Sequence, residues 1–309
     1  MGLIDLERKE QIKEKKYRAY HLQRSNNISG LLFISPFYII FAIFGLFPLA
    51  FTIVMSFYRW SMLGEKQFIG FDNYKLLFTN DPLFWLSVTN TFKIWFMSTV
   101  PQLILALILA FILNMAFLKG KGIFRLAVFM PNITSIVAVA IVFSSMFGTN
   151  YGVINYFLEL FGLNPIDWSG TRIGTQVAIS VMIMWRWVGY NTIIYLSGLQ
   201  GISKDLYEAA TIDGASTRQQ FLYITVPMMR PIILFTVILS TIGGMQIFTE
   251  PLLFGKGSVN QGLTMTLYLY EEAFTRYSFG YAAAVAWILF FIIILFSLVN
   301  MLLTRIIRS

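Results

Sequence analysis

The sequence predicts an all-α membrane protein with six transmembrane helices. Hydrophobic residues make up 57% of the 309 residues and charged residues only 12%, a balance typical of membrane proteins rather than of soluble domains. Apolar runs recur along the chain between polar loops. They reach the length of about 20 residues that a helix needs to cross a bilayer.

Residues 1–29 are expected to form a cytoplasmic N-terminal segment, and residues 30–305 the transmembrane domain. Within the first segment, acids and bases alternate at helical spacing from Leu3 to Leu22, which predicts a solvated or surface-lying helix. Prolines inside several spans should kink them, as a packed helical bundle tolerates. The six predicted spans cover about residues 31–57, 90–113, 123–147, 173–199, 231–249 and 281–304.

The distribution of positive charge predicts which side of the membrane each loop faces. Lys and Arg are usually more abundant in cytoplasmic loops than in outer loops. Fifteen of them lie in the two termini and in the regions around residues 119–125 and 200–230, whereas seven lie in the alternate set of loops. Both termini and residues 200–230 are therefore expected to face the cytoplasm. The formal charge of +8 is assigned to this topology, and no nucleic-acid partner is expected.

The composition excludes several kinds of chemistry. The chain has no cysteine and a single histidine, His21, so disulfides and thiolate metal sites are excluded, and neither another metal site nor histidine-based catalysis is expected. The phosphate-binding pattern G-x-x-x-x-G-K-[ST] does not occur, so the chain is not expected to bind or hydrolyse ATP. We therefore expect a subunit without enzymatic activity or a cofactor of its own.

Residues 200–230 are a polar island between two apolar runs and are expected to form a helical hairpin. Ser203 can cap the first short helix, and Gly214 supplies a left-handed stop after it. The pair Ser216 and Gln219 is a capping-box pattern for a second helix, which Pro227 is expected to end.

The hairpin also carries a resemblance to a known family. Glu208-Ala-Ala, Gly214 and Ile224-Thr-Val-Pro stand at the offsets of the pattern EAA-x3-G-x9-I-x-L-P, with Val226 in place of Leu. Residues 68–74, Phe-Ile-Gly-Phe-Asp-Asn-Tyr, are similar to the F-x-G-x-x-N-Y signature of carbohydrate-type permeases. The chain thus resembles the permease subunits of binding-protein-dependent ABC importers, most closely the maltose and multiple-sugar branch.

This resemblance implies a fold, a set of partners and a role for the hairpin. The fold is that of a type I ABC importer permease in a bacterial cytoplasmic membrane. The partners are a second homologous permease, an ABC ATPase dimer that binds ATP and Mg, an extracytoplasmic solute-binding protein and a sugar substrate. The hairpin corresponds to the coupling helix, which sits in a groove of the ATPase. The residues expected to make this contact are Glu208, Ala209, Ala210, Asp213, Gly214 and Ala215.

A charged residue inside a span marks a candidate substrate path. Arg186 lies in the fourth predicted span, where a charge costs at least about 2.5 kcal/mol and must face protein or water. Tyr190 follows one turn later on the same face, and Asn191 lies beside it. An aromatic ring beside a guanidinium or amide suits a sugar. We expect Arg186, Tyr190 and Asn191 to border the path, with Asn132 and Gln246 on facing helices.

Two alternatives stay open at this point. Arg186 is equally compatible with a structural role, paired with carbonyl groups or with an acid on another helix. The whole chain is also compatible with an ion-coupled secondary transporter. Such a protein needs acidic residues within its spans, and only Glu250, at an outer end, meets that requirement.

Overall fold

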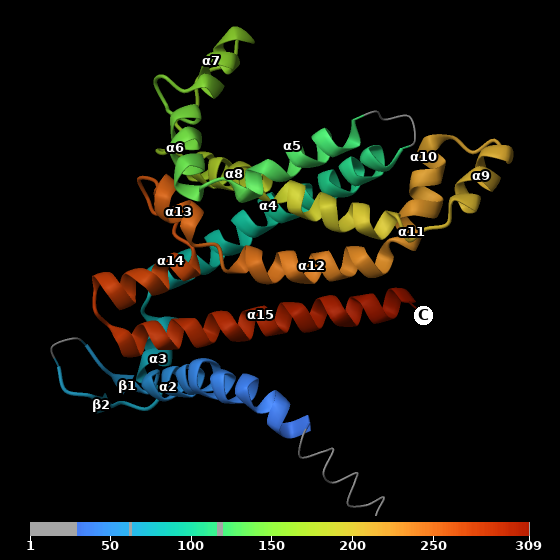
Figure 1. Ribbon diagram of the computed structural model, residues 1–309. Helices are drawn as coiled ribbons and strands as arrows, with labels where there is room; N and C mark the ends of the chain where they lie inside the picture. Colours follow the sequence, from blue (N-terminus) through green and yellow to red (C-terminus); the bar gives the residue numbers. More distant parts are fainter. Residues whose placement is uncertain (1–29, 62–63, 116–119, 309) are drawn as a thin grey trace, which may run out of the picture. The chain divides into compact units, whose positions relative to one another are not determined.

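The computed structural model describes residues 30–61, 64–115 and 120–308 (Figure 1). The helix expected at Leu3 to Leu22 lies outside the described residues. The chain divides into two compact units, Met1–Met55 and Ser56–Ser309. Apart from two strands of two residues each, the regular structure of the described residues is helical.

The described part of the first unit is one apolar helix, Gly30–Met55, with a mean hydropathy of 2.4. A π-helical turn, η1 (Ala42–Leu46), interrupts it just before Pro48 and continues into α2 (Phe47–Met55). The amide of Phe47 donates to the carbonyl of Ala42, five residues back. Proline has no N–H and collides with the carbonyl four residues earlier in an α-helix. The wider π turn relieves this conflict, so the helix continues through Pro48.

The second unit begins with two short strands and a short helix. Strands β1 (Tyr58–Arg59) and β2 (Gln67–Phe68) pair antiparallel, and α3 (Asp72–Thr79) follows. The long helix α4 (Pro82–Asn114) then starts eight residues before the predicted boundary at 90. Its start is fixed by the Asp81 side chain, which accepts a hydrogen bond of 2.9 Å from the amide of Phe84. This is a strong helix start signal, whereas hydropathy alone marks only the apolar part.

The third predicted span is not one straight helix. Helix α5 (Lys121–Ile133) and α6 (Ile136–Met146) meet at an angle of 92°. Thr134 adopts an extended backbone there, and its hydroxyl donates to the carbonyl of Met130 at 2.8 Å. Pro131 lies inside the last turn of α5 and removes one backbone donor from that helix, so the break occurs where helical hydrogen bonding is already weakened. A short helix, α7 (Val153–Leu160), lies beyond α6 (Figure 1).

The remainder of the chain alternates long apolar helices with groups of short ones. By length and composition, five helices of the described chain could cross a membrane, or six if the bent pair α5–α6 counts as one span. The remaining elements are α8 (Arg172–Leu199), α9 (Lys204–Ile212), α10 (Thr217–Gln220), η2 (Phe221–Thr225), α11 (Val226–Met228), α12 (Arg230–Met245), α13 (Thr249–Phe254), α14 (Met265–Tyr270), η3 (Glu271–Thr275) and α15 (Phe279–Arg308).

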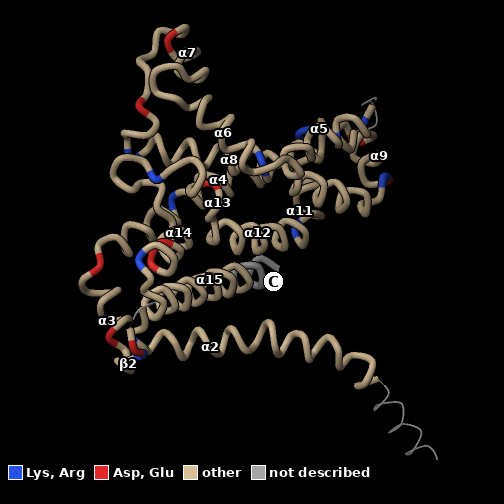
Figure 2. The backbone as a smooth tube through the Cα atoms, turned by 60° about the vertical axis from the view of Figure 1, so that its left-hand side comes forward, with Lys and Arg blue, Asp and Glu red and all other residues tan. Residues whose placement is uncertain are grey.

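Helices α4 and α8 form the centre of the second unit. They pack along each other, with α5 on the far side of α8 and α12 between α4 and α15 (Figure 1). Ala106 and Ala110 of α4 are fully buried and leave room for Tyr195 and Leu199 of α8. Small residues such as these two alanines are the usual means of close helix packing in membranes. Helix α12 carries no charged residue between its ends, as its tan colour in Figure 2 shows.

Helices α5 and α8 approach each other closely at Gly189 of α8, and this contact yields a stability prediction. A Cβ atom built on Gly189 would lie 1.8 Å from the carbonyl oxygen of Val128 in α5. We expect Gly189→Ala to force α5 away from α8 and to cost about 1–3 kcal/mol of stability. The check is the thermal unfolding midpoint in detergent. Gly122→Ala in α5 is the matched control, because a Cβ there meets nothing within 4 Å, and it should leave the midpoint unchanged or raise it.

Candidate functional site

The hairpin between α8 and α12 begins with a tightly terminated helix. Ser203 caps α9 by accepting a hydrogen bond from the amide of Asp205, as expected. At the other end, the amide of Gly214 donates to the carbonyl of Thr211 at 3.1 Å, and the amide of Ala215 donates to the carbonyl of Ala210 at 2.8 Å. These two bonds are the Schellman arrangement, which requires a left-handed residue. Gly214 has φ of +79°, which confirms the predicted left-handed stop.

The second half of the hairpin starts as predicted but ends differently. Ser216 and Gln219 form both hydrogen bonds of the capping box at the start of α10. The prediction that Pro227 ends this helix is wrong, because the helical run continues through η2 and α11 to Met228. The amide of Val226 donates to the carbonyl of Phe221, so a π turn precedes Pro227 as it precedes Pro48 and accommodates the ring.

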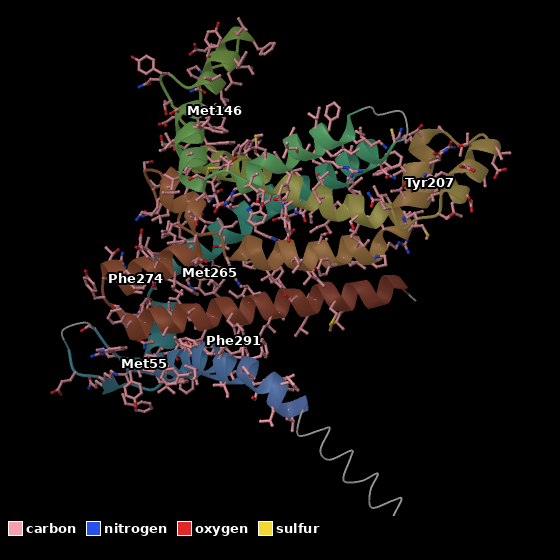
Figure 3. All side chains as sticks on the ribbon, viewed as in Figure 1. Met55, Met146, Tyr207, Met265, Phe274 and Phe291 are labelled. Carbon is pink, nitrogen blue, oxygen red and sulfur yellow. The ribbon has the colours of Figure 1, made fainter. Side chains whose placement is uncertain are left out.

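Internal hydrogen bonds join the two arms of the hairpin. The hydroxyls of Tyr207 and Thr225 lie 2.9 Å apart, and the Gln220 amide donates to the hydroxyl of Thr211 at 2.9 Å. Tyr207 is labelled in Figure 3, at this end of the molecule. The arms are therefore held to each other by side chains as well as by the turn at Gly214.

The predicted contact residues of the hairpin lie mostly on its surface. Glu208, Ala209, Asp213 and Gly214 are exposed, whereas Ala210 and Ala215 are half-buried. Glu208 makes no ion pair within the described chain. The apolar side chain of Ile212 is 86% exposed at the end of α9. Glu208, Ile212 and the turn at Gly214 therefore all lie on the surface of the hairpin.

A cavity of about 400 Å³ lies between α4, α8 and the junction of α12 with α13. Four of the five predicted path residues line it, namely Arg186, Tyr190, Asn191 and Gln246. Asn132 of α5, the fifth, is half-buried and is not among the lining residues. The other lining residues are Thr99, Gln102, Ile183, Trp187, Leu239, Ser240, Gly243, Gly244, Ile247, Phe248, Thr249 and Glu250.

Arg186 has an acidic partner across the cavity. Its Nη1 lies 3.5 Å from Oε1 of Glu250, the first-turn acid of α13. The side chains are 19% and 9% exposed. The Nε of Arg186 is buried and has no hydrogen-bond partner among the described residues. The pairing of Arg186 with an acid on another helix, one of its two predicted roles, is therefore present. Arg186 also lines the cavity, and its place on a substrate path stays a prediction.

The aromatic and amide groups of α8 occupy different positions in the cavity. Trp187 and Tyr190 are both partly exposed, and their rings meet edge to face with centroids 5.6 Å apart. Asn191 is buried, and its amide donates to the carbonyl of Trp187 at 3.3 Å, so part of its hydrogen-bonding capacity is used within its own helix. The two rings are therefore the most exposed of the α8 side chains that line the cavity.

An interruption of helical structure between α12 and α13 places backbone groups beside the cavity. Helix α12 ends at Met245, and α13 begins at Thr249, so Gln246 to Phe248 are not helical. Gly244, in the last turn of α12, lets this helix pack closely against α4, because a Cβ there would lie 2.5 Å from the Trp95 ring of α4. Non-helical backbone at membrane depth is tolerated where it lines a cavity, and broken helices of this kind form the binding sites of many transporters.

Sequence reasoning missed a buried amide cluster that fixes the loop after α13. The Asn90 amide of α4 donates to the carbonyls of Asn260 and Leu263, at 2.8 and 3.1 Å. The Gln176 amide of α8 donates to Oδ1 of Asn90 at 2.9 Å and to the carbonyl of Gln261 at 3.2 Å. We call Asn90, Gln176 and these three loop residues the amide clasp. Its only sequence signal is two amide residues at the starts of two spans.

A second polar cluster joins the same ends of α4, α14 and α15. The hydroxyls of Tyr268 and Tyr281 both donate to Asp81, and Glu272 of η3 is paired with Arg276. Burial raises the pKa of the Glu272 carboxyl above its usual range, and Arg276 opposes that shift. These groups satisfy one another, so the cluster works as a structural junction.

Comparisons with known proteins agree with this architecture. A family model described as binding-protein-dependent transport system inner membrane component matches residues 76–308. The lactose transport system permease protein of Rhizobium radiobacter is 41% identical over 277 residues, which is 87% of this chain and 91% of that protein. The arabinooligosaccharides transport system permease protein of Bacillus subtilis is 34% identical over 280 residues, 90% of this chain and 88% of that protein.

Among solved structures, a similar chain comes from a bacterial ABC transporter involved in the import of the acidic polysaccharide alginate. The TM-score is 0.81 at 23% sequence identity, and the match covers 94% of this chain and all of that chain. At this level of identity the likeness concerns the fold, and it agrees with the predicted importer permease architecture.

Proposed function

Because this chain belongs to the family of binding-protein-dependent transport system inner membrane components, we propose that it moves a sugar or oligosaccharide across a bacterial cytoplasmic membrane as one permease subunit of an ATP-driven importer. The observation that carries the proposal is the hairpin. Its motif residues build a fixed turn at Gly214, flanked by the exposed Glu208 and Ile212.

The hairpin is the part that connects this chain to ATP hydrolysis. A separate ATPase dimer, carrying ATP and Mg, would hold it in a groove. Glu208 would offer a charged hydrogen bond, while the small Ala209 would permit close approach. Because the hairpin is internally hydrogen-bonded and lies directly between α8 and α12, a displacement of the ATPase would move both helices as rigid bodies.

The cavity supports a saccharide as the transported molecule. Trp187 and Tyr190 offer faces on which the apolar side of a sugar ring can stack, and Gln102, Ser240 and Gln246 offer groups that bond hydroxyls. Two relatives are named as permeases for lactose and for arabinooligosaccharides. A volume of about 400 Å³ falls within the usual range of small-molecule sites. A second homologous permease would complete the path, and an extracytoplasmic solute-binding protein would deliver the sugar.

The alternative of an ion-coupled transporter has less support. Neither the family match nor the relatives favour it. The acid that such a mechanism would use, Glu250, is already paired with Arg186.

The proposed orientation is tested with a single thiol, because the natural chain has no cysteine. Ile212→Cys places a thiol at the exposed end of α9, on the face proposed to meet the ATPase in the cytoplasm. When the permease is expressed without the ATPase, so that this face is uncovered, a membrane-impermeant maleimide should label it in inverted vesicles and not in sealed protoplasts. Tyr151→Cys, at a 98% exposed position beside α7, is the matched control and should show the opposite pattern. Labelling of Ile212→Cys in sealed protoplasts would contradict the orientation.

A further inference from the structure

We propose that the Arg186–Glu250 pair keeps the cavity electrically neutral and thereby selects uncharged saccharides, with Glu250 as the residue that sets this selectivity. The inference rests on the proposed function, because it names the class of substrate for the same cavity. It concerns the charge of the site, which the hairpin motif does not address.

The charge balance of the cavity is simple. Arg186 and Glu250 are the two charged residues among those that line it in the described part of the chain. They come from different elements, α8 and α13, so the neutral pair forms only when the broken helix is folded against α8. Both side chains are largely buried, where a single unpaired charge would act strongly on any ligand in the cavity.

The geometry of the pair leaves hydrogen-bonding groups available. The Nη1 to Oε1 distance of 3.5 Å is longer than the roughly 2.8 Å of a charge-assisted hydrogen bond. The guanidinium therefore has its charge balanced while it still has N–H groups to donate, and sugar hydroxyl oxygens are suitable acceptors.

The same arrangement disfavours charged sugars of either sign. A uronate carboxylate would compete with Glu250 for Arg186 and would place two carboxylates close together. An amino sugar would place its ammonium beside Arg186. Like charges in a partly buried site repel strongly. A neutral saccharide meets neither penalty and retains the contacts with Trp187, Tyr190 and Gln246.

The first test measures the charge of the cavity directly. Ser240→Cys, in the lining on α12, is introduced into a cysteine-free assembled importer. Its reaction rates with an anionic and a cationic methanethiosulfonate reagent are compared. With the pair intact, their ratio should match that of Tyr151→Cys, the exposed control. Glu250→Gln should raise the anion-to-cation ratio by about tenfold or more, and Arg186→Gln should lower it by a similar factor. The double variant should return it to the starting value, while the Tyr151→Cys ratio stays unchanged throughout.

The second test uses sugars as protecting ligands in the same Ser240→Cys protein. Lactose is compared with the same disaccharide oxidised to a carboxylate at C6 of the galactose. With the pair intact, lactose should protect the thiol at a concentration at least about tenfold lower than the acid does. Glu250→Gln should remove or reverse that preference. Equal or better protection by the acid with the pair intact would overturn the inference, and so would a reagent ratio that neither substitution moves.

The outcomes separate the inference from the proposed function. If both sugars protect equally in every variant, the cavity binds saccharides and only the selectivity assignment fails. If neither sugar protects the thiol in any variant, the cavity is not the sugar site, and both the proposed path and the inference are wrong. The comparison with the pair intact uses the natural residues at 186 and 250, so it remains decisive even if a single substitution prevents assembly.

Discussion

Gly214→Val should uncouple transport from ATP hydrolysis while leaving the membrane domain folded. The left-handed φ of +79° at Gly214 is costly for a β-branched residue, by about 1–3 kcal/mol. That cost falls on the Schellman turn, which sets the angle between α9 and α10. We expect substrate-stimulated ATP turnover in the assembled importer to fall by about tenfold or more, since each 1.4 kcal/mol is a factor of ten.

Gly122→Val is the matched control for this experiment. Gly122 lies in a helix, α5, has no left-handed φ, and a Cβ there meets no atom within 4 Å. Both variants should insert into the membrane at the natural level, as measured by surface labelling and by yield in detergent. If the two variants lose ATP turnover equally, the turn at Gly214 has no special part in coupling. If Gly214→Val loses membrane insertion as well, the hairpin is only structural.

Asn90→Leu should release the loop of residues 255–264 and destabilise the second unit. Leucine matches the shape of asparagine but leaves the carbonyls of Asn260 and Leu263 without their donor, and the Gln176 amide without one of its acceptors. Each buried polar group left unpaired costs about 1–3 kcal/mol. We expect a clear fall in the thermal unfolding midpoint, together with faster proteolytic cleavage between Gly255 and Leu263.

Thr89→Leu provides the comparison for the clasp. Thr89 is the exposed neighbour of Asn90, and its hydroxyl donates to the carbonyl of Trp85 in its own helix. This variant should change the free energy of unfolding by less than about 0.5 kcal/mol and so leave the midpoint nearly unchanged. A normal midpoint and normal protease resistance for Asn90→Leu would mean that water or other groups replace its hydrogen bonds and that the clasp is dispensable.

Features that depend on nearby residues were predicted well from the sequence. The cap at Ser203, the turn at Gly214 and the capping box at Ser216 each use hydrogen bonds between residues a few positions apart, so residue type and spacing suffice. The helical membrane fold, with five candidate spans or six if the bent pair counts as one, was also predictable, because the hydrocarbon thickness sets the length of each apolar run. The end expected at Pro227 failed because a π turn accommodates proline inside a helix, and no residue pattern marked that turn.

Features that depend on distant residues could not be read from single positions. The partners of Asn90 are carbonyl groups about 170 positions away, and every residue has a carbonyl, so nothing in the sequence distinguishes them. The bend at Thr134 lies in a stretch whose composition also suits a continuous span. The partner of Arg186 is different. Glu250 was the single acid at the end of a predicted span, and that uniqueness was a usable signal for the pair.

The amide clasp holds one end of α8 in place, so a tilt of this helix displaces its other end the most. Gln176 is held near the start of the helix, the hairpin follows its far end, and Arg186 lies between them. At a rise of 1.5 Å per residue, a tilt of about 5° about Gln176 moves Leu199 by about 3 Å and Arg186 by about 1 Å. A shift of that size is comparable with the margin between a 3.5 Å ion pair and a separated one. A displacement of about 3 Å at the hairpin end of α8 is therefore enough to form or separate the Arg186–Glu250 ion pair in the cavity.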